Sequence, residues 1–392
     1  MVRVWPQDFK RTGESITISS IIESPAGRQE LWYRVPAKWE FALTRQADPF
    51  AIATLLLAMK SGGGMNIHGT VSPSLLQNLE EFQAVWASWL PQRYETTSMT
   101  AERYHEGPQP QTDSAVVSFS GGLDACFSVY QHVNRLCGRR SRQIGAAVLV
   151  HGFDIPYQKD EPFKKALAAA SAILISESIP VITVQTNWRS LGVSWDDGFA
   201  TAISACLSLF SRNFSHGLIA SGETYPNLAE YLPWGSNPLT DPMLSSAAFK
   251  ISHDAGAYNR IQKAAGLLHW KTALDNLRVC WEGPMTGANC GVCEKCIRTI
   301  LDFRVIGGGL PSCFPSDVSD KVIRALRIKS RAQRLNIADI VHEARRRGRG
   351  AESWVRVLED RLREYDRRTT RKTALHRRVF RKARSLLRAM CQ

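Results

Sequence analysis

The chain has 392 residues, of which 44% are apolar and 22% are charged, and its formal net charge is +14. These proportions are ordinary for a globular protein, and the length is enough for two or three domains. No run of about 18 apolar residues occurs, which excludes a membrane-spanning helix, and no apolar signal core follows Met1. We therefore expect a cytoplasmic protein whose nine cysteines are reduced thiols or metal ligands rather than disulfides.

The positive charge is concentrated in the last part of the chain. Residues 321–392 hold 23 basic and 7 acidic side chains, whereas the other 320 residues hold 27 basic and 29 acidic ones. The positive net charge of the chain therefore does not indicate that residues 1–320 act on a nucleic acid.

The first 110 residues predict a small α/β accessory domain. The predicted elements are strands over 16–18 and 31–35 and helices over 48–59 and 74–89. Asp48 is expected to be the N-cap of the first helix, followed by Pro49 at its first position. The sequence Gly-Pro-Gln-Pro-Gln at 107–111 predicts a linker that ends this domain.

Residues 111–316 alternate predicted strands with predicted helices. The strands are expected at 115–118, 146–151, 180–184 and 217–220, and the helices at 125–136, 162–176, 195–209 and 257–264. This alternation predicts an α/β domain with a doubly wound parallel sheet. Ligands bind such sheets at the carboxyl ends of the strands. The stretch 225–246 is expected to be irregular and to form a binding loop or lid.

Residues 317–392 predict a basic helical extension, interrupted by an exposed hinge at 344–350. Three interpretations are open for its charge. The extension binds nucleic acid through phosphates, docks on an acidic partner or on the acidic remainder of the chain, or is a solvated helical surface. Few aromatic residues lie among the charges, which disfavours base stacking.

The segment Ser118-Phe119-Ser120-Gly121-Gly122-Leu123-Asp124-Ala125 follows an apolar strand and opens a helix. Adjacent glycines let the backbone approach an anion, and the first N–H groups of a helix attract negative charge. The loop contains no lysine, so it is not the G-x-x-x-x-G-K-[ST] phosphate loop. A carboxylate at Asp124 fits a Mg²⁺ ion that bridges it to a pyrophosphate. The alternative is a glycine-rich turn that binds nothing.

Four of the nine cysteines, Cys280, Cys290, Cys293 and Cys296, form the pattern C-x9-C-x2-C-x2-C. Four thiolates suit Zn²⁺ in a closed structural site, and Gly291 permits the tight turn between ligands. An iron–sulfur cluster is the main alternative, because it also uses four cysteines. The other five cysteines are scattered along the chain.

Polar residues follow two further strands. His151 and Asp154 either border a nucleotide or metal site, or cap a strand end and start a turn. Gly222 and Glu223 follow the fourth strand, where Glu223 is either a Mg²⁺ ligand or proton acceptor, or an exposed loop carboxylate.

Two pairs of cations are also candidates. Arg260 and Lys263 are three residues apart and share a helix face, so they form either a phosphate clamp or a solvated basic surface. Lys295 and Arg298 flank the cysteine cluster, where they either neutralise its charge or reach the nucleotide.

The Ser-Gly-Gly-x-Asp loop resembles the signature of the PP-loop ATP pyrophosphatases. Together with the late cysteine pattern, it resembles the 7-cyano-7-deazaguanine synthases of the queuosine pathway, and their larger relatives in bacterial defence gene sets. The resemblance covers roughly residues 114–310. It implies that ATP adenylates a carboxylate or amide oxygen of a small-molecule or macromolecular acceptor, releasing pyrophosphate, and that a nitrogen nucleophile then displaces AMP.

This resemblance implies ATP, Mg²⁺ and Zn²⁺ as cofactors. Asp124 and Ser120 are the expected catalytic residues. The expected cofactor-binding residues are Ser118, Phe119, Ser120, Gly121, Gly122, Leu123, Asp124, Ala125, His151, Gly222, Arg260 and Lys263. Two alternatives remain: a tRNA-modifying adenylase or thiolase of the same superfamily, and a non-catalytic subunit that senses ATP.

Overall fold

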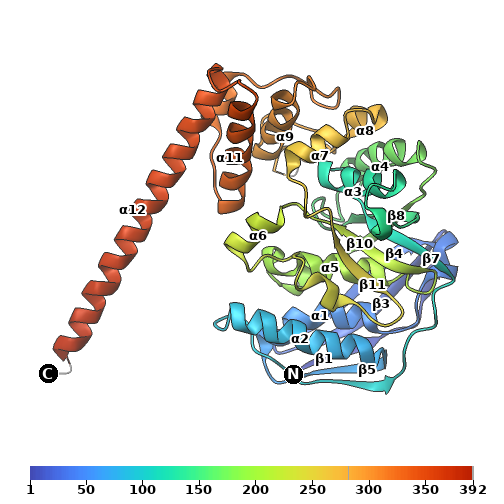
Figure 1. Cartoon of the computed structure of the whole chain (residues 1–392). Coiled ribbons are helices and arrows are strands. Elements are labelled where there is room, and N and C mark those ends of the chain that lie inside the picture. The colour runs from blue at the N-terminus through green and yellow to red at the C-terminus, as the bar shows by residue number, and fades with distance from the viewer. Residues whose placement is uncertain (281, 391–392) are drawn as a thin grey trace.

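The computed structural model describes residues 1–280 and 282–390, with side chains up to residue 371 (Figure 1). Its strands are β1 Val2–Pro6, β2 Lys10–Thr12, β3 Ser15–Ser24, β4 Gly27–Pro36, β5 Met65–Val71, β6 Met99–Tyr104, β7 Thr112–Ser118, β8 Ile144–His151, β9 Val181–Thr186, β10 Phe214–Ala220 and β11 Lys250–Asp254. Its α-helices are α1 Asp48–Ser61, α2 Pro73–Trp89, α3 Leu123–Val133, α4 Asp160–Ile175, α5 Trp195–Ser208, α6 Tyr225–Tyr231, α7 Arg260–Gly266, α8 Lys271–Asn276, α9 Glu294–Val305, α10 Asp320–Ala325, α11 Arg331–Arg346 and α12 Ser353–Met390. Short 3-10 helices are η1 Ala37–Ala42, η2 Gly138–Arg140, η3 Trp188–Leu191 and η4 Asp241–Leu244.

One mixed sheet of 11 strands runs through the molecule in the order β11-β10-β7-β8-β9-β4-β3-β1-β5-β6, with β2 beside β3. The strands β11, β10, β7, β8 and β9 are all parallel. β4 joins β9 in antiparallel orientation, so the strands of residues 1–110 continue the same sheet. The α/β class predicted from the sequence is therefore confirmed, but the sheet is mixed rather than wholly parallel.

Helices cover both faces of the parallel strands, because apolar side chains on successive strand residues point to opposite faces. Val116 and Val148 belong to a core with α1 and α5, whereas Val117 and Leu149 belong to a second core with α3. The first of these cores also contains the apolar residues of β1, β3, β4 and β5. The boundary predicted near residue 110 is thus crossed by one sheet and one core.

The helix α1 shows why its predicted start needs a correction. Ala47 is its N-cap, and Asp48 is already the first helical residue, with Pro49 next. The carboxylate of Asp48 instead accepts hydrogen bonds from the backbone N–H (2.9 Å) and the hydroxyl (2.6 Å) of Ser72. A long-range polar contact has replaced the local cap that the sequence suggested.

Two further segments differ from their predictions. The stretch 225–246 holds α6 and η4 and is therefore not wholly irregular. The predicted hinge at 344–350 is displaced to 347–352, because α11 continues to Arg346 and α12 begins at Ser353. The helical character of the basic extension is confirmed, and Figure 1 shows α12 reaching beyond the other elements.

The loop between β7 and α3 lies where the winding of the parallel strands reverses. β7 lies between β8 and β10. The α3 and α4 residues pack in one core, and those of α5, which leads from β9 to β10, pack in the other. Such a reversal leaves a crevice at the carboxyl ends of the central strands, where doubly wound sheets bind ligands.

Candidate functional site

The loop from Ser118 to Ala125 has the strand–turn–helix context that its sequence predicted. Ser118 ends β7, Gly122 is the N-cap of α3, and Gly121 has φ +75°, a left-handed conformation that favours glycine. The hydroxyl of Ser120 accepts a hydrogen bond of 3.3 Å from the N–H of Gly122 and is exposed. The first turn of α3 is therefore open to a ligand, which is the geometry of an anion site.

The flanking apolar residues of this loop hold it in place. Phe119 and Leu123 are buried in the core on the α3 face, and the N–H of Phe119 donates to the carbonyl of Val148 at 2.8 Å. Phe119 is thus an anchor beneath the loop, whereas Leu123 both packs in this core and lines the cavity beside Asp124.

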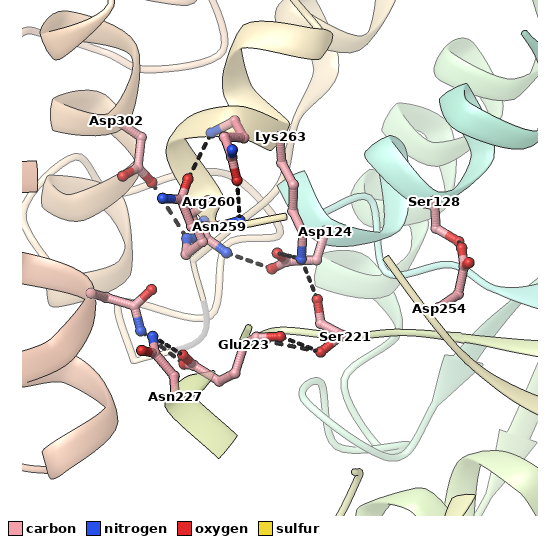
Figure 2. Close-up of polar contacts among 12 residues, drawn as sticks. Asp124, Ser128, Ser221, Glu223, Asn227, Asp254, Asn259, Arg260, Lys263 and Asp302 are labelled. Carbon is pink, nitrogen blue, oxygen red and sulfur yellow. Dashed lines mark hydrogen bonds and ion pairs between the residues drawn. The ribbon is translucent and has the colours of Figure 1, made fainter. Parts of the chain in front are cut away.

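Asp124 forms hydrogen-bonded ion pairs with two cations of α7. Arg260 Nη1 donates to Asp124 Oδ2, and Lys263 Nζ donates to Oδ1 at 3.0 Å and also to the carbonyl of Ser221 (Figure 2). Burial raises the pKa of Asp124, but Arg260 and Lys263 outweigh it and hold that pKa below its ordinary value. The two cations that the sequence placed on one helix face therefore meet the loop carboxylate directly.

A second layer of polar contacts holds Arg260. Its Nη2 donates to Thr299 Oγ1 at 2.9 Å, and its Nε lies 3.4 Å from Asp302 Oδ2, both on α9. Burial raises the pKa of Asp302 to about 7, against the opposing effect of Arg260. The guanidinium is thus fixed from two sides, which reduces the entropy it would lose on binding a ligand.

A cavity opens beside this cluster. It is lined by Ser120, Gly122, Asp124, Ala125, Asp154, Arg260, Arg278 and Lys295, with Leu123, Val279 and Cys280. The lining contains three cationic side chains and two carboxylates, and the Asp124 side chain is 18% exposed. A small, polar, net cationic cavity at a helix N-terminus is suited to a phosphorylated ligand.

The four cysteines of the predicted metal site come together, with their Sγ atoms all within 4.8 Å of one another. The Sγ atoms of Cys290 and Cys296 lie 3.9 Å apart, and those of Cys293 and Cys280 lie 3.8 Å apart. Four thiolates at the Zn–S distance of about 2.3 Å in a tetrahedron are about 3.8 Å apart. The cluster therefore fits a single metal ion such as zinc.

Glycines shape this cysteine cluster. Gly291 has φ +74°, as the expected tight turn between ligands requires. A Cβ on Gly283 would lie 2.7 Å from Cys280 Sγ and 2.9 Å from Cys290 Sγ, so only glycine fits beside the ligands. The sequence pattern of the ligands did not identify Gly283, because its role depends on the fold of the loop.

The cysteine cluster adjoins the cavity through the segment 277–280. The N–H of Arg278 donates to the carbonyl of Gly121 at 2.8 Å, and Cys280 lines the cavity. Asn289 Oδ1 accepts from the N–H groups of Val279 (2.9 Å) and Cys280 (3.3 Å). The glycine loop and the metal-ligand loop thus share one short connecting segment.

Six of the twelve predicted cofactor-binding residues do not line the cavity: Ser118, Phe119, Gly121, His151, Gly222 and Lys263. His151 is buried, stacks on Phe163 with ring centroids 4.1 Å apart, and contacts the Pro156 carbonyl (3.0 Å) and Gln185 Nε2 (3.2 Å). Burial lowers its pKa, which matches a neutral structural histidine. Gly222 lies beside Ser221, whose carbonyl accepts from Lys263, so it contacts the cluster only through its neighbour.

The adjacent Glu223 is buried rather than exposed. Asn336 Nδ2 on α11 donates to its Oε1 at 2.8 Å, and Asn227 Nδ2 lies 3.4 Å from its Oε2. Burial raises the pKa of Glu223. The carboxylate therefore joins the helical extension to α6 (Figure 2).

His132, Cys137 and Asp254 form another set of potential ligand atoms. However, His132 Nδ1 accepts a hydrogen bond of 3.0 Å from the backbone N–H of Arg142. A neutral ring that accepts at Nδ1 carries its proton on Nε2, the atom that faces Asp254 at 3.3 Å. Nε2 then has no lone pair for a metal, so this group is a structural polar contact.

Arg278 is a charged residue of the cavity lining that the sequence patterns did not predict. It lies outside both motifs, and its Nη2 is 3.8 Å from Asp154 Oδ2 across the cavity. Its position two residues before the predicted metal ligand Cys280 is the one sequence feature that could have indicated it. Asp154 was placed correctly at the strand end, and it lines the cavity.

No family model, no curated protein and no solved structure matches this chain. None of the helices in the described part of the chain has the length and apolar character of a membrane span.

Proposed function

We propose that this chain is an ATP-dependent ligase or synthase of the PP-loop ATP pyrophosphatase type. In this proposal ATP adenylates a carboxylate or amide oxygen, and a nitrogen nucleophile then displaces AMP. The single observation that carries the proposal is the cavity between the first turn of α3 and the cations Arg260, Arg278 and Lys295. The loop signature and its resemblance to the 7-cyano-7-deazaguanine synthases supply the reaction type.

The arrangement supports phosphate binding by two kinds of donor. Ser120 and the first residues of α3 line the cavity, where a hydroxyl and backbone N–H groups are neutral donors, and the three cationic side chains supply positive charge. Attack on the α-phosphorus breaks its bond to the bridging oxygen, and the electron pair leaves with pyrophosphate. Fixed cations stabilise that developing charge more strongly than water does, because they need no reorganisation.

The residues fit Mg²⁺ better at Asp154 than at Asp124. Both carboxylate oxygens of Asp124 already accept hydrogen bonds from cations, which weakens them as metal ligands. Asp154 is 35% exposed, and its ion pair with Arg278 is long at 3.8 Å. We propose that Asp154 holds the Mg²⁺ of bound ATP and that Asp124 orients Arg260 and Lys263.

We assign the four-cysteine cluster to structural zinc. Its Sγ separations of 3.8 and 3.9 Å match one tetrahedral ion. In an iron–sulfur cluster, several iron and sulfide atoms lie between the cysteines and spread their Sγ atoms further apart. The expected protein is colourless and contains one zinc per chain.

The basic extension offers less free charge than its composition suggests. Six of the seven acidic residues in 321–392 form ion pairs with arginines of the extension, for example Arg345 with Glu359 at 2.7 Å and Arg334 with Asp366 at 3.2 Å. Binding of nucleic acid or of an acidic protein stays a prediction, and the side chains after residue 371 lie outside the described residues.

The test uses ATP labelled on its α-phosphate, mixed with the full-length protein and a cell extract that supplies the acceptor. We expect pyrophosphate and AMP in equal amounts, together with a product that mass spectrometry identifies as modified. Formation of ADP and phosphate instead, or no consumption of ATP with any extract, would contradict the proposal.

A further inference from the structure

We propose that the zinc knuckle, residues 280–296, aims Lys295 at the phosphates of the bound nucleotide, so that zinc binding and nucleotide binding strengthen each other. This inference rests on the proposed function, but it concerns a residue outside the glycine loop.

The position of Lys295 in the chain ties it to the metal ligands. It lies between Cys293 and Cys296, and Cys293 is also the N-cap of α9. Zinc bound to both cysteines fixes the backbone on either side of Lys295. The direction of its side chain therefore depends on whether the metal is present.

The surroundings of Lys295 indicate what it binds. Its side chain lines the same cavity as Ser120 and Asp124. Among the described residues, no hydrogen bond or ion pair reaches its ammonium group, whereas Arg260 and Arg278 each face a carboxylate. Lys295 is thus a cavity cation without a hydrogen-bonding partner among the described residues; Asp154 and Asp124 attract it only at longer range, and Arg260 and Arg298 repel it. Such an ammonium group is free to bind an anionic ligand.

The glycine loop itself supplies no cation. Residues 118–125 contain no lysine or arginine, and Lys263 is occupied by Asp124 and the Ser221 carbonyl. A flexible lysine with three donors is suited to follow phosphate oxygens as a bond breaks. Lys295 provides this group from α9, outside the glycine loop.

The second connection between the metal and the loop is the segment 277–280. Arg278 donates through its backbone to Gly121, and Cys280 is a metal ligand in the same segment. Loss of zinc therefore releases both Lys295 and the segment that supports the glycine loop. Such coupling is reciprocal, because each ligand must stabilise the binding of the other by the same factor.

The experiment measures binding of α,β-methylene-ATP and of inorganic pyrophosphate to the full-length, zinc-loaded protein by calorimetry. Three variants are compared: Lys295→Met, Lys295→Arg and Lys271→Met. Lys271 is an exposed lysine on α8 that pairs with Asp275 and does not line the cavity, so it controls for the loss of one charge.

We expect Lys295→Met to weaken both ligands at least tenfold, Lys295→Arg to recover most of that loss, and Lys271→Met to bind like the wild type. Circular dichroism and zinc content show whether each variant is folded. If the wild type binds the analogue and Lys295→Met binds it equally well, this inference is wrong while the proposed function stands. If the wild type binds neither ligand, the proposed function fails, and this inference with it.

A second measurement tests the coupling itself. A chromophoric chelator removes zinc from each protein with and without pyrophosphate, and the fraction of zinc retained is read from its absorbance. We expect pyrophosphate to increase zinc retention in the wild type and in Lys271→Met but not in Lys295→Met. Equal protection in all three proteins would overturn the coupling through Lys295.

Discussion

The two regions joined by the continuous sheet, residues 1–110 and 111–316, differ in how many charged side chains they bury. Within residues 1–110, all of which are described, Asp48 is the one buried charged side chain. The described residues of 111–316 bury ten: Asp197, Glu223, Asp241, Asp254, Arg260, Lys263, Arg278, Glu294, Arg298 and Asp302. Several of these meet at the carboxyl ends of the parallel strands.

This difference separates a supporting region from the region that holds the candidate site. Burying a charge is costly even when it is paired, and a hydrophobic side chain of similar size is often at least as stabilising. A concentration of buried ion pairs beside a cavity therefore points to a function rather than to stability. Residues 1–110 extend the sheet and its core, whereas residues 111–316 hold the site.

Removal of a metal ligand tests the difference between the two regions most severely. Cys290→Ser is expected to lose the bound zinc and to destabilise the protein by roughly 5 kcal/mol or more, because metal binding is coupled to folding of the knuckle and of α9. Metal analysis and denaturant unfolding measure both effects. Cys137→Ser is the control and should keep its zinc; loss of zinc there would show that the ion lies with His132 and Asp254.

The next test removes a buried cation. Arg260→Met leaves Asp124 and Asp302 without their guanidinium partner, and breaking a buried pair in this way costs about 3–5 kcal/mol. Unfolding in urea measures the loss. Arg34→Met removes an exposed arginine on β4 that hydrogen-bonds Gln185, and we expect a change within about 0.5 kcal/mol. Similar losses in both variants would contradict the distinction drawn between the two regions.

Asp48, in the region of residues 1–110, is expected to make the stability of the protein depend on pH. Burial raises the pKa of Asp48 to about 6, although its hydrogen bonds with Ser72 oppose this. Between the unfolded pKa near 4 and this value, the folded state holds a proton that the unfolded state has lost. The stability that this group contributes therefore falls as pH rises through that window, by about 3 kcal/mol.

Asp48→Asn keeps an acceptor for the Ser72 N–H and removes the titration. We expect the variant to gain stability relative to the wild type between pH 4 and 7, as measured by urea unfolding at each pH. A difference that does not change with pH would show that Asp48 does not titrate in this range.

The smallest expected effect is at Glu223. Because burial raises its pKa, the wild type loses stability as pH rises above the ordinary range of a glutamate, and Glu223→Gln should be more stable at pH 8 by about 1 kcal/mol or less. The gain is limited because one of the two asparagine donors loses its acceptor. Unfolding at pH 5 and pH 8 measures it. A loss of nucleotide binding in this variant would instead place Glu223 in the site.

The motifs that were predictable from sequence are those with local geometry. The turn at Gly121 and Gly122, the start of α3 and the grouping of the four cysteines each depend on residues close together in the chain. The helical spacing of Arg260 and Lys263 also placed both on one face. Their target, Asp124, lies 136 residues from Arg260, and no local pattern indicates such a contact.

Other features depended on long-range packing. The joining of β4 to β9 depends on two strands distant in sequence, and His151 became a buried stacking partner of Phe163 although its strand-end position suggested a ligand. Arg278 enters the cavity because the metal-ligand segment passes the glycine loop. Sequence patterns identify individual residues of such a site, but only the fold shows which of these residues contact one another.

We propose above all that the cavity at the start of α3 binds the phosphates of ATP. The most direct test of this proposal is calorimetric titration of the zinc-loaded, full-length protein with α,β-methylene-ATP in the presence of Mg²⁺. The account predicts one site per chain with Kd on the order of micromolar, and at least a hundredfold weaker binding in Arg260→Met, whose fold is checked by circular dichroism. Undetectable binding to the wild type, or equal binding to both proteins, would contradict it.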